Sequence, residues 1–385
     1  MGKKYKIIQF LGGLDQGGAE SVIRDYALEL TKRGHEVEIP LFYTTPDMPN
    51  QIALEEAGVR IDVFRGYYSR NKIKRLYNKI LTLVNFDEIK LGKLIKEFKP
   101  DIIHIHGYTL GCFKHLDKEL EGIKLFYTCH STPSEFFEGA WRKQYQIAQR
   151  LIADHNLQMI ALHREMAEEL NSMFNIDNTK ILNNPICLDR FTSDKLDKAF
   201  LKRQYGIASD AFVVGHVGRF DALKNHMLLL DIFYEIQKVK PEAFLLLVAA
   251  SGGDTYCEVI DKIRRLGIGN KTMIMLDRKD MPEIYKIMDV FIFPSKIEGF
   301  GLALLEAQAS GIKCLVSEKI PESAIVKKNV FRINLDADIE EWVEMAINKN
   351  DSYVSPKGKI EDYSINHVTD CLERIYGLKS TRKES

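Results

Sequence analysis

The sequence lacks a long apolar run, closely spaced cysteines and an excess of either charge. No stretch approaches the roughly 18 apolar residues that a membrane-spanning helix needs. The six cysteines lie far apart, without the C-x-x-C pairing of a metal or redox site. We therefore expect free thiols in a reducing compartment. The 54 Lys and Arg residues equal the 54 Asp and Glu residues, so bulk charge gives no support to nucleic-acid binding.

The first residues, MGKKYKIIQFLGG, combine basic residues with a short apolar run. No small-residue cleavage site follows, so this run predicts a first strand better than a signal peptide. The sixth residue is Lys6, not Ser or Thr, so N-myristoylation is not expected either. These features favour a cytoplasmic protein.

Short apolar runs alternate with amphipathic stretches along the whole chain, and the series restarts after about Phe191. Such alternation predicts parallel sheets covered by helices. The strand-like runs are at 6–12, 35–43, 60–64, 101–107, 125–130 and 158–163, and then at 212–220, 243–251, 271–276, 289–295 and 312–318.

Two such series predict an α/β protein with two Rossmann-like, doubly wound domains that face each other across a cleft. We place the first domain at 1–190 and the second at 191–363. The remaining segment, 364–385, contains a helix at about 365–376, which we expect to cross back to the first domain.

Ligands of such sheets bind beyond the carboxyl ends of the strands. After the first strand, Gly17 and Gly18 precede a helix that has Glu20 near its start. Glycines let the backbone approach a ligand, and a helix N-terminus favours an anion. After the run at 212–217 come Arg219 and Lys224, which could be phosphate-binding cations or a solvated surface pair.

The stretch KIEGFGLALLEAQASG, residues 296–311, carries two acids. We expect Glu298 on a loop and a helix that begins near Phe300 or Gly301. The turn formed by Gly299, Phe300, Gly301 and Leu302 would then offer free amides to a ligand. Glu306 lies inside the apolar helix, where an unpaired charge is costly, so we expect it to have a partner. Anion-binding amides, two cations and two carboxylates suit a sugar nucleotide.

These pieces resemble the retaining glycosyltransferase family 4, which has the GT-B fold. The matching motifs are GGAE at 17–20, PDIIHIHG at 100–107, TCH at 128–130, VGRFDALKNH at 217–226 and EGFGLALLE at 298–306. The last is the Glu-x(7)-Glu motif of the family and is the most specific. Together the motifs cover most of the chain in the family's order.

The resemblance implies a role for each matching residue. Glu298 would contact hydroxyls of the donor sugar, and Glu306 would hold the ribose of the nucleotide. Arg219 and Lys224 would neutralise the leaving diphosphate. Gly18 would lie beside the phosphates and His130 near the transferred sugar. The family usually needs no metal ion, so no metal and no cofactor are expected.

The sequence departs from the family pattern at two places. The crossover between domains has Asn184-Pro185 where the family often has Asn-Gly, which restricts the backbone there. After the strand that ends near Ala250, Ser251-Gly252-Gly253-Asp254 replaces the usual Gly-acid-Gly. The second departure bears on contacts near the base, so UDP is the favoured nucleotide without being fixed.

Two other patterns in the sequence are weak candidates for metal sites. Asp336 and Asp338 resemble a metal-binding pair, but Asp338 fits better as an N-cap of the helix that follows. His104 and His106 alternate on one face of a strand. Two ligands without a third make a weak metal site, so we favour a structural or substrate-facing role.

The segment 70–84 is strongly basic and has apolar residues at helical spacing. It fits equally a peripheral helix on the anionic inner face of the plasma membrane and a domain helix with one core face. Lipid-linked acceptors, which some members of the family use, favour the membrane.

The leading hypothesis is a retaining hexosyltransferase that moves a sugar from a UDP-sugar to a lipid-linked or glycan acceptor in exopolysaccharide or capsule biosynthesis. The alternatives are a sugar-nucleotide epimerase of the same fold and a non-catalytic, transferase-like binding subunit. A glycosidase is less compatible, because it needs two carboxyl groups across one glycosidic bond.

Overall fold

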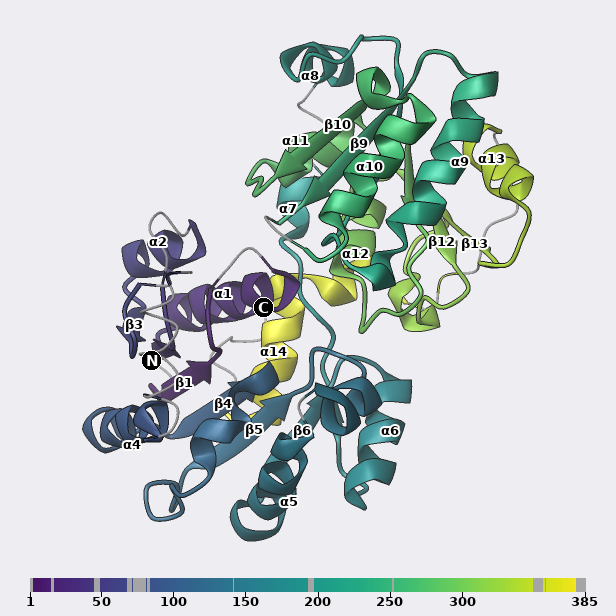
Figure 1. Ribbon diagram of the computed structural model, residues 1–385. Coiled ribbons are helices and arrows are strands. Elements are labelled where there is room, and N and C mark those ends of the chain that lie inside the picture. Colours follow the sequence, from purple (N-terminus) through teal and green to yellow (C-terminus); the bar gives the residue numbers. More distant parts are fainter. Residues whose placement is uncertain are drawn as a thin grey trace. The chain divides into compact units, whose positions relative to one another are not determined.

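The computed structural model of the protein describes residues 3–14, 17–44, 49–67, 71, 81, 84–140, 142–192, 197–250, 253–348, 356 and 358–378. The chain forms two compact units, and Figure 1 gives the labels of their elements. Unit 1 consists of Met1–Pro185 and Ile365–Ser385, and unit 2 of Ile186–Ser364. Asn184-Pro185 therefore ends the first segment of unit 1.

Unit 1 is built on a seven-stranded parallel sheet in the order β3-β2-β1-β4-β5-β6-β7. Its strands are β1 (Lys6–Phe10), β2 (Glu36–Leu41), β3 (Arg60–Val63), β4 (Ile102–His106), β5 (Lys124–Thr128), β6 (Gln158–Ala161) and β7 (Lys180–Ile181). Its α-helices are α1 (Gly18–Lys32), α2 (Pro49–Glu56), α4 (Phe86–Phe98), α5 (Lys143–His155), α6 (Arg164–Phe174) and α14 (Ile365–Ile375). A 3-10 helix, η1 (Gly107–Phe113), follows β4, and a π-helical segment, η2 (Glu135–Ala140), follows β5.

Unit 2 is built on a six-stranded parallel sheet in the order β10-β9-β8-β11-β12-β13. Its strands are β8 (Phe212–Val217), β9 (Ala243–Ala249), β10 (Thr272–Leu276), β11 (Val290–Phe293), β12 (Lys313–Ser317) and β13 (Val330–Ile333). Its α-helices are α7 (Leu188–Phe191), α8 (Lys198–Gln204), α9 (His226–Val239), α10 (Tyr256–Leu266), α11 (Met281–Ile287), α12 (Leu302–Ala309) and α13 (Ile339–Ile347). Its 3-10 turns are η3 (Ala222–Lys224), η4 (Gly269–Lys271), η5 (Glu322–Ala324) and η6 (Ile360–Tyr363).

The two predicted parallel sheets are confirmed. All pairings between the described strands are parallel. Because helices cover the strands, the sequences of the strands are apolar runs. Unit 2 has a continuous core that contains fully buried side chains of α9, β8, β9 and β11. Trp342 of α13 is fully buried in the same core. The run at 330–333 was not predicted as a strand, because Arg332 interrupts its apolar pattern.

The last helix, α14, belongs to unit 1. Figure 1 shows it, at the yellow end of the sequence, beside α1, and the two helices are in contact. Arg33, directly after α1, bonds to three carboxylates. Its guanidinium lies 3.0 Å from Glu29 Oε1, 2.6 Å from Asp370 Oδ1 and 2.8 Å from Glu373 Oε2. The helix that follows unit 2 in the chain is therefore fixed to α1 of unit 1.

The basic segment 70–84 lies outside the described residues except for Asn71, Leu81 and Val84. Ser251 and Gly252 of the second departure also lie outside them. Among the helices formed by the described residues, none is both long enough and apolar enough to cross a bilayer.

Candidate active site

The site in unit 2 lies where the connections of its sheet change direction. From β8 the chain proceeds outward through β9 and β10, and then returns to β11 on the other side of β8. Loops that follow the two central strands of such a sheet diverge and leave room for a ligand. Arg219 and Lys224 follow β8, and Glu298 follows β11. The amide of Lys296 donates a 2.7 Å hydrogen bond to the carbonyl of Leu223, which joins the two loops.

Lys224 and Glu298 form an ion pair. Lys224 Nζ lies 2.6 Å from Glu298 Oε1, and the two side chains are only 17% and 7% exposed. Lys224 Nζ also lies 5.6 Å from the ring centre of Phe293. Asp221 holds the turn that carries the lysine, because its carboxylate accepts the amides of Leu223 and Lys224 at 3.0 and 3.1 Å. The structure thus brings together two residues that the sequence predicted for one site.

Arg219 lies on the same loop as Lys224 but extends toward solvent. Its side chain is 73% exposed, and its guanidinium lies 3.6 Å from Asp221 Oδ2. An exposed pair at this distance contributes little to stability. The guanidinium is therefore not fixed in place by the fold.

Glu306 has the partner that its apolar surroundings predicted. The hydroxyl of Tyr285, on α11, lies 2.9 Å from Glu306 Oε2 and 3.1 Å from the carbonyl of Ala303. Burial and the Glu306 charge raise the pKa of Tyr285 well above its ordinary value, so the phenol stays a proton donor. Sequence reasoning missed Tyr285, because nothing in MPEIYKI distinguishes it from a core tyrosine.

The turn before α12 is made by a left-handed glycine. The helix begins at Leu302, one or two residues later than predicted, because Gly301 has φ of +84° and acts as its N-cap. Phe300 is buried, with its ring 5.6 Å from that of Tyr363, so only its backbone could reach a ligand. The first bonds of the helix run from the amides of Leu304 and Leu305 to the carbonyl of Gly301. The preceding amides belong to the orphan donors of a helix start.

In unit 1, the predicted glycine turn contains an acid of its own. Gly17 is the N-cap of α1, and a Cβ on it would lie 2.0 Å from Glu20 Oε2. The carboxylate of Glu20 therefore lies against the start of α1, where negative charge is favourable. Gly18, the first residue of the helix, is exposed. A phosphate near these glycines would meet Glu20, which the motif alone did not indicate.

His130 follows β5 and bonds to another histidine. Its Nε2 lies 3.0 Å from Nδ1 of His106 on β4. Burial lowers the pKa of His130 to about 4, so the ring is neutral at pH 7. His104 and His106 are fully buried, and hydrogen bonds occupy both nitrogens of each ring. Within the described part of the chain, no cluster of three or more His, Cys, Asp or Glu residues could hold a metal ion.

Asp338 occupies the N-cap position of α13, as predicted, but its side chain makes no capping hydrogen bond.

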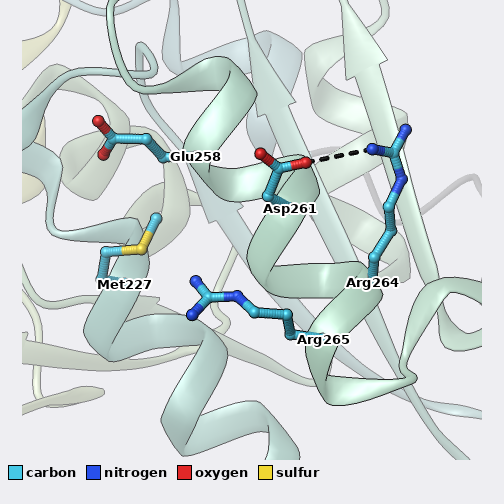
Figure 2. Close-up of a pocket in the computed structure, with 5 residues that line it drawn as sticks. All are labelled: Met227, Glu258, Asp261, Arg264 and Arg265. Atoms are coloured by element: carbon cyan, nitrogen blue, oxygen red, sulfur yellow. Dashed lines mark hydrogen bonds and ion pairs between the residues drawn. The ribbon is translucent and has the colours of Figure 1, made fainter.

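Two hollows lie away from these residues. One, of about 640 Å³, lies between α9 and α10. Figure 2 shows Met227 and Arg265 of its lining on facing helices. Its charges are partly paired, since Arg264 lies 3.1 Å from Asp261. The other, of about 670 Å³ in unit 1, is lined by Phe137, Glu138, Arg142, Lys143, Tyr145, Gln146 and Met173. Neither is lined by a residue predicted for the site.

Family models match both halves of the chain. Residues 16–190 match the model described as Glycosyltransferase Family 4, and residues 197–349 match Glycosyl transferases group 1. The chain belongs to glycosyltransferase family 4. It is therefore an enzyme of the glycosyltransferase class, as the motifs predicted.

Curated relatives with similar sequences are also named as glycosyltransferases. The chain is 25% identical over 347 residues to the putative glycosyltransferase EpsF of Bacillus subtilis, covering 88% of this chain and 86% of that protein. It is 28% identical over 282 residues to an Escherichia coli UDP-Gal:α-D-GlcNAc-diphosphoundecaprenol α-1,3-galactosyltransferase, covering 69% and 70%.

Solved structures share the fold of the glycosyltransferase. Anabaena HepE, solved with UDP and glucose, has a TM-score of 0.72 at 18% identity, covering 97% of this chain and 99% of that one. Sucrose-phosphate synthase of Thermosynechococcus elongatus has a TM-score of 0.75 at 16% identity, covering 97% and 98%. These likenesses confirm the predicted GT-B class, with two Rossmann-like sheets.

Proposed function

We propose that this glycosyltransferase transfers a hexose, with retention at the anomeric carbon, from a UDP-sugar to a lipid-linked sugar or glycan acceptor. The reaction would serve the synthesis of a surface polysaccharide, either an exopolysaccharide or a capsule. The observation that carries the proposal is the buried pair of Lys224 and Glu298 at the switch point of the unit 2 sheet.

Unit 2 would bind the nucleotide sugar. Lys224 and Arg219 would neutralise the diphosphate, together with the amides of Gly299, Phe300, Gly301 and Leu302 at the start of α12. Cations and amides in these positions would supply the positive charge that a departing diphosphate needs. We therefore propose that transfer requires no divalent metal.

The two glutamates would bind different parts of the donor. Glu298 is held by Lys224 on a loop and would accept hydrogen bonds from hydroxyls of the sugar. Glu306 lies inside α12, where it accepts a hydrogen bond from the hydroxyl of Tyr285. It would accept another hydrogen bond from the ribose. Carboxylates fixed by their own partners are oriented before the ligand arrives, which lowers the entropy lost on binding.

Unit 1 would bind the acceptor, with Gly17 and Gly18 near the phosphates and His130 near the transferred sugar. The Escherichia coli relative named above acts on a diphosphoundecaprenol-linked sugar, which supports a lipid-linked acceptor. The basic segment 70–84 would then hold the enzyme at the cytoplasmic, inner face of the plasma membrane.

A product assay tests this proposal. The protein is incubated with UDP-glucose, UDP-galactose, UDP-GlcNAc or GDP-mannose, with and without a diphosphate-lipid-linked GlcNAc acceptor, in Mg²⁺ or in EDTA. We expect sugar transfer from one of the UDP-sugars, and we expect this activity to persist in EDTA. Isomerised donor without acceptor would indicate the epimerase, and binding without turnover would indicate the non-catalytic subunit. Activity that is lost in EDTA and restored by Mg²⁺ would contradict the metal-independent site.

A further inference from the structure

A line of polar side chains crosses the otherwise apolar sheet of unit 1. Gln9 on β1, His104 and His106 on β4, and Thr128 on β5 are at most 4% exposed. Strand register places Gln9 beside His104, and His106 beside Thr128. A buried polar group is costly unless it is hydrogen-bonded, so such a line needs a complete set of partners.

The partners include the C-terminal helix segment. Gln9 Nε2 donates to the hydroxyl of Tyr376 at 2.9 Å, and that hydroxyl lies 2.7 Å from His104 Nδ1. His104 Nε2 lies 2.7 Å from Thr128 Oγ1. Because the Tyr376 oxygen accepts from Gln9, its own proton is available to His104, which in turn donates from Nε2 to Thr128.

The second branch leads from Gln9 to His130. With its amide nitrogen on Tyr376, Gln9 presents its carbonyl Oε1 to His106 Nε2 at 2.7 Å. A carbonyl only accepts, so His106 carries its proton on Nε2, and its Nδ1 is an acceptor. That Nδ1 faces His130 Nε2 at 3.0 Å, so His130 must be the donor. Burial lowers the pKa of His106 well below its ordinary value, which keeps that ring neutral.

The other nitrogen of His130 remains available. Among the described residues, the hydrogen bond to His106 is the one that His130 makes. His130 is half-buried, in contrast to His104 and His106, which are fully buried. The chain of donors therefore ends on a ring with one protonated nitrogen turned inward and one bare nitrogen, Nδ1.

We propose that Gln9 and His106 are positioning residues, which hold His130 as its Nε2–H tautomer so that Nδ1 accepts a hydrogen bond from a hydroxyl of the donor sugar. This inference rests on the proposed function, in which His130 contacts that sugar. A neutral acceptor nitrogen selects a hydroxyl over a carboxylate at the same position. The donor would thus be a neutral hexose in preference to a uronic acid.

The tautomer can be measured without any variant. Protein labelled with ¹⁵N in its histidine rings is studied by long-range ¹H–¹⁵N correlation at pH 7, with the His130 signals assigned by their loss in His130→Gln. We expect a protonated Nε2 and a bare Nδ1. A protonated Nδ1, or a doubly protonated ring, would overturn the proposal whether or not the enzyme is active.

Kinetics test the positioning role. Asn at position 106 can place an amide oxygen where His106 Nδ1 lies, whereas Leu cannot accept a hydrogen bond. We expect His106→Leu to lower kcat/KM by about tenfold, as the loss of one buried hydrogen bond does, and His106→Asn to recover most of it. His115→Asn, at a ring that is 57% exposed, is the matched control. Equal losses in the Leu and Asn variants would overturn the positioning role.

The two proposals can fail separately. If His130→Ala transfers sugar as the wild type does, the role assigned to His130 in transfer is wrong, and the catalytic reason for the chain is lost with it. The tautomer measurement still decides whether the chain has the stated direction. A donor panel in which UDP-glucuronic acid is used as well as UDP-glucose would contradict the selection of a neutral sugar.

Discussion

Lys224 screens the charge of Glu298 in a site whose proposed ligand is an anion. A free carboxylate beside a diphosphate would repel it, but a carboxylate bonded to a lysine presents little net charge. The same bond fixes Glu298 Oε1 and leaves the second oxygen for a sugar hydroxyl. In the proposed function, the pair would thus allow one loop residue to bind the sugar next to the phosphates.

We expect the two glutamates of the motif to differ when each is changed to Gln. Glu298→Gln removes the charge that would act on the sugar, so transfer should fall by about 10²–10³, while UDP binds at least as tightly as to wild type. Glu306→Gln should weaken UDP itself through the ribose. Calorimetry with UDP and initial rates with the donor separate the two effects. A Glu298→Gln enzyme with the wild-type rate, or with a defect wholly in UDP affinity, would refute this division.

At the residue level, the sequence predicted those site residues that belong to a recognisable motif. The acids, the cations and the glycine at 301 stand in a spacing that a single sequence reveals. Tyr285 and Gln9 could not be found this way, because each lies far in sequence from the residue it contacts or has no distinctive neighbours. Their roles follow from strand order and helix packing, which long-range contacts decide.

At the scale of elements, α14 is held by charges rather than by apolar contact alone. Arg33 and Glu373 have side chains only 6% and 4% exposed, and His35 Nε2 lies 3.0 Å from Glu373 Oε1. Burial alone would raise the pKa of Glu373, but the hydrogen bonds from His35 and Arg33 outweigh it and hold that pKa below its ordinary value. The carboxylate is therefore ionised, and its bond to the end of α1 depends on Arg33.

Arg33→Met should detach α14. Removal of the arginine leaves the buried carboxylate of Glu373 without its guanidinium partner, which costs about 3–5 kcal/mol in comparable pairs. Hydrogen exchange should rise in α14 and α1 before it rises in the strands of unit 2. Arg374→Met is the control, because Arg374 is exposed and its hydrogen bonds to described residues stay within α14. Equal protection of α14 in the two variants would show that apolar packing holds the helix.

The elements themselves were largely predictable. Each predicted run overlaps one of β1–β6 or β8–β12, since parallel strands buried on both faces are uniformly apolar. The missed strands are β7, which has two residues, and β13, which Arg332 divides. Arg332 bonds to the carbonyls of Glu318 and Ile320, so a charge is tolerated in that strand for a reason that no local pattern contains.

Across the whole molecule, buried histidines predict sensitivity to acid. Burial lowers the pKa of His130 and of His226 to about 4, and lowers those of His104, His106 and His216 well below the ordinary value. The unfolded chain protonates these rings near pH 6.5, whereas the folded chain does not until about pH 4 at His130 and His226. Their contribution to stability is therefore complete above pH 6.5 and is lost as the pH falls toward 4.

Stability should thus decline by about 1.4 kcal/mol per pH unit for each such histidine below pH 6.5. Urea unfolding at pH 7.5, 6 and 5, followed by hydrogen exchange in peptides of β4 and β8, measures the decline in each unit. His226→Asn should reduce the slope in unit 2 alone. A free energy of unfolding that stays constant between pH 7.5 and 5 would contradict the prediction.

The chain order of α14 has a consequence for how the protein is made. Gln9 and His104 are among the early residues to leave the ribosome, whereas Tyr376, which bonds to both, is translated after the whole of unit 2. During that interval the polar line in unit 1 lacks the two hydrogen bonds that the phenol of Tyr376 makes. Domains usually fold as they emerge, from the N-terminus onward. Here the domain begun first is completed last, so a nascent chain that stalls in unit 2 leaves unit 1 unfinished and recognisable to chaperones and proteases.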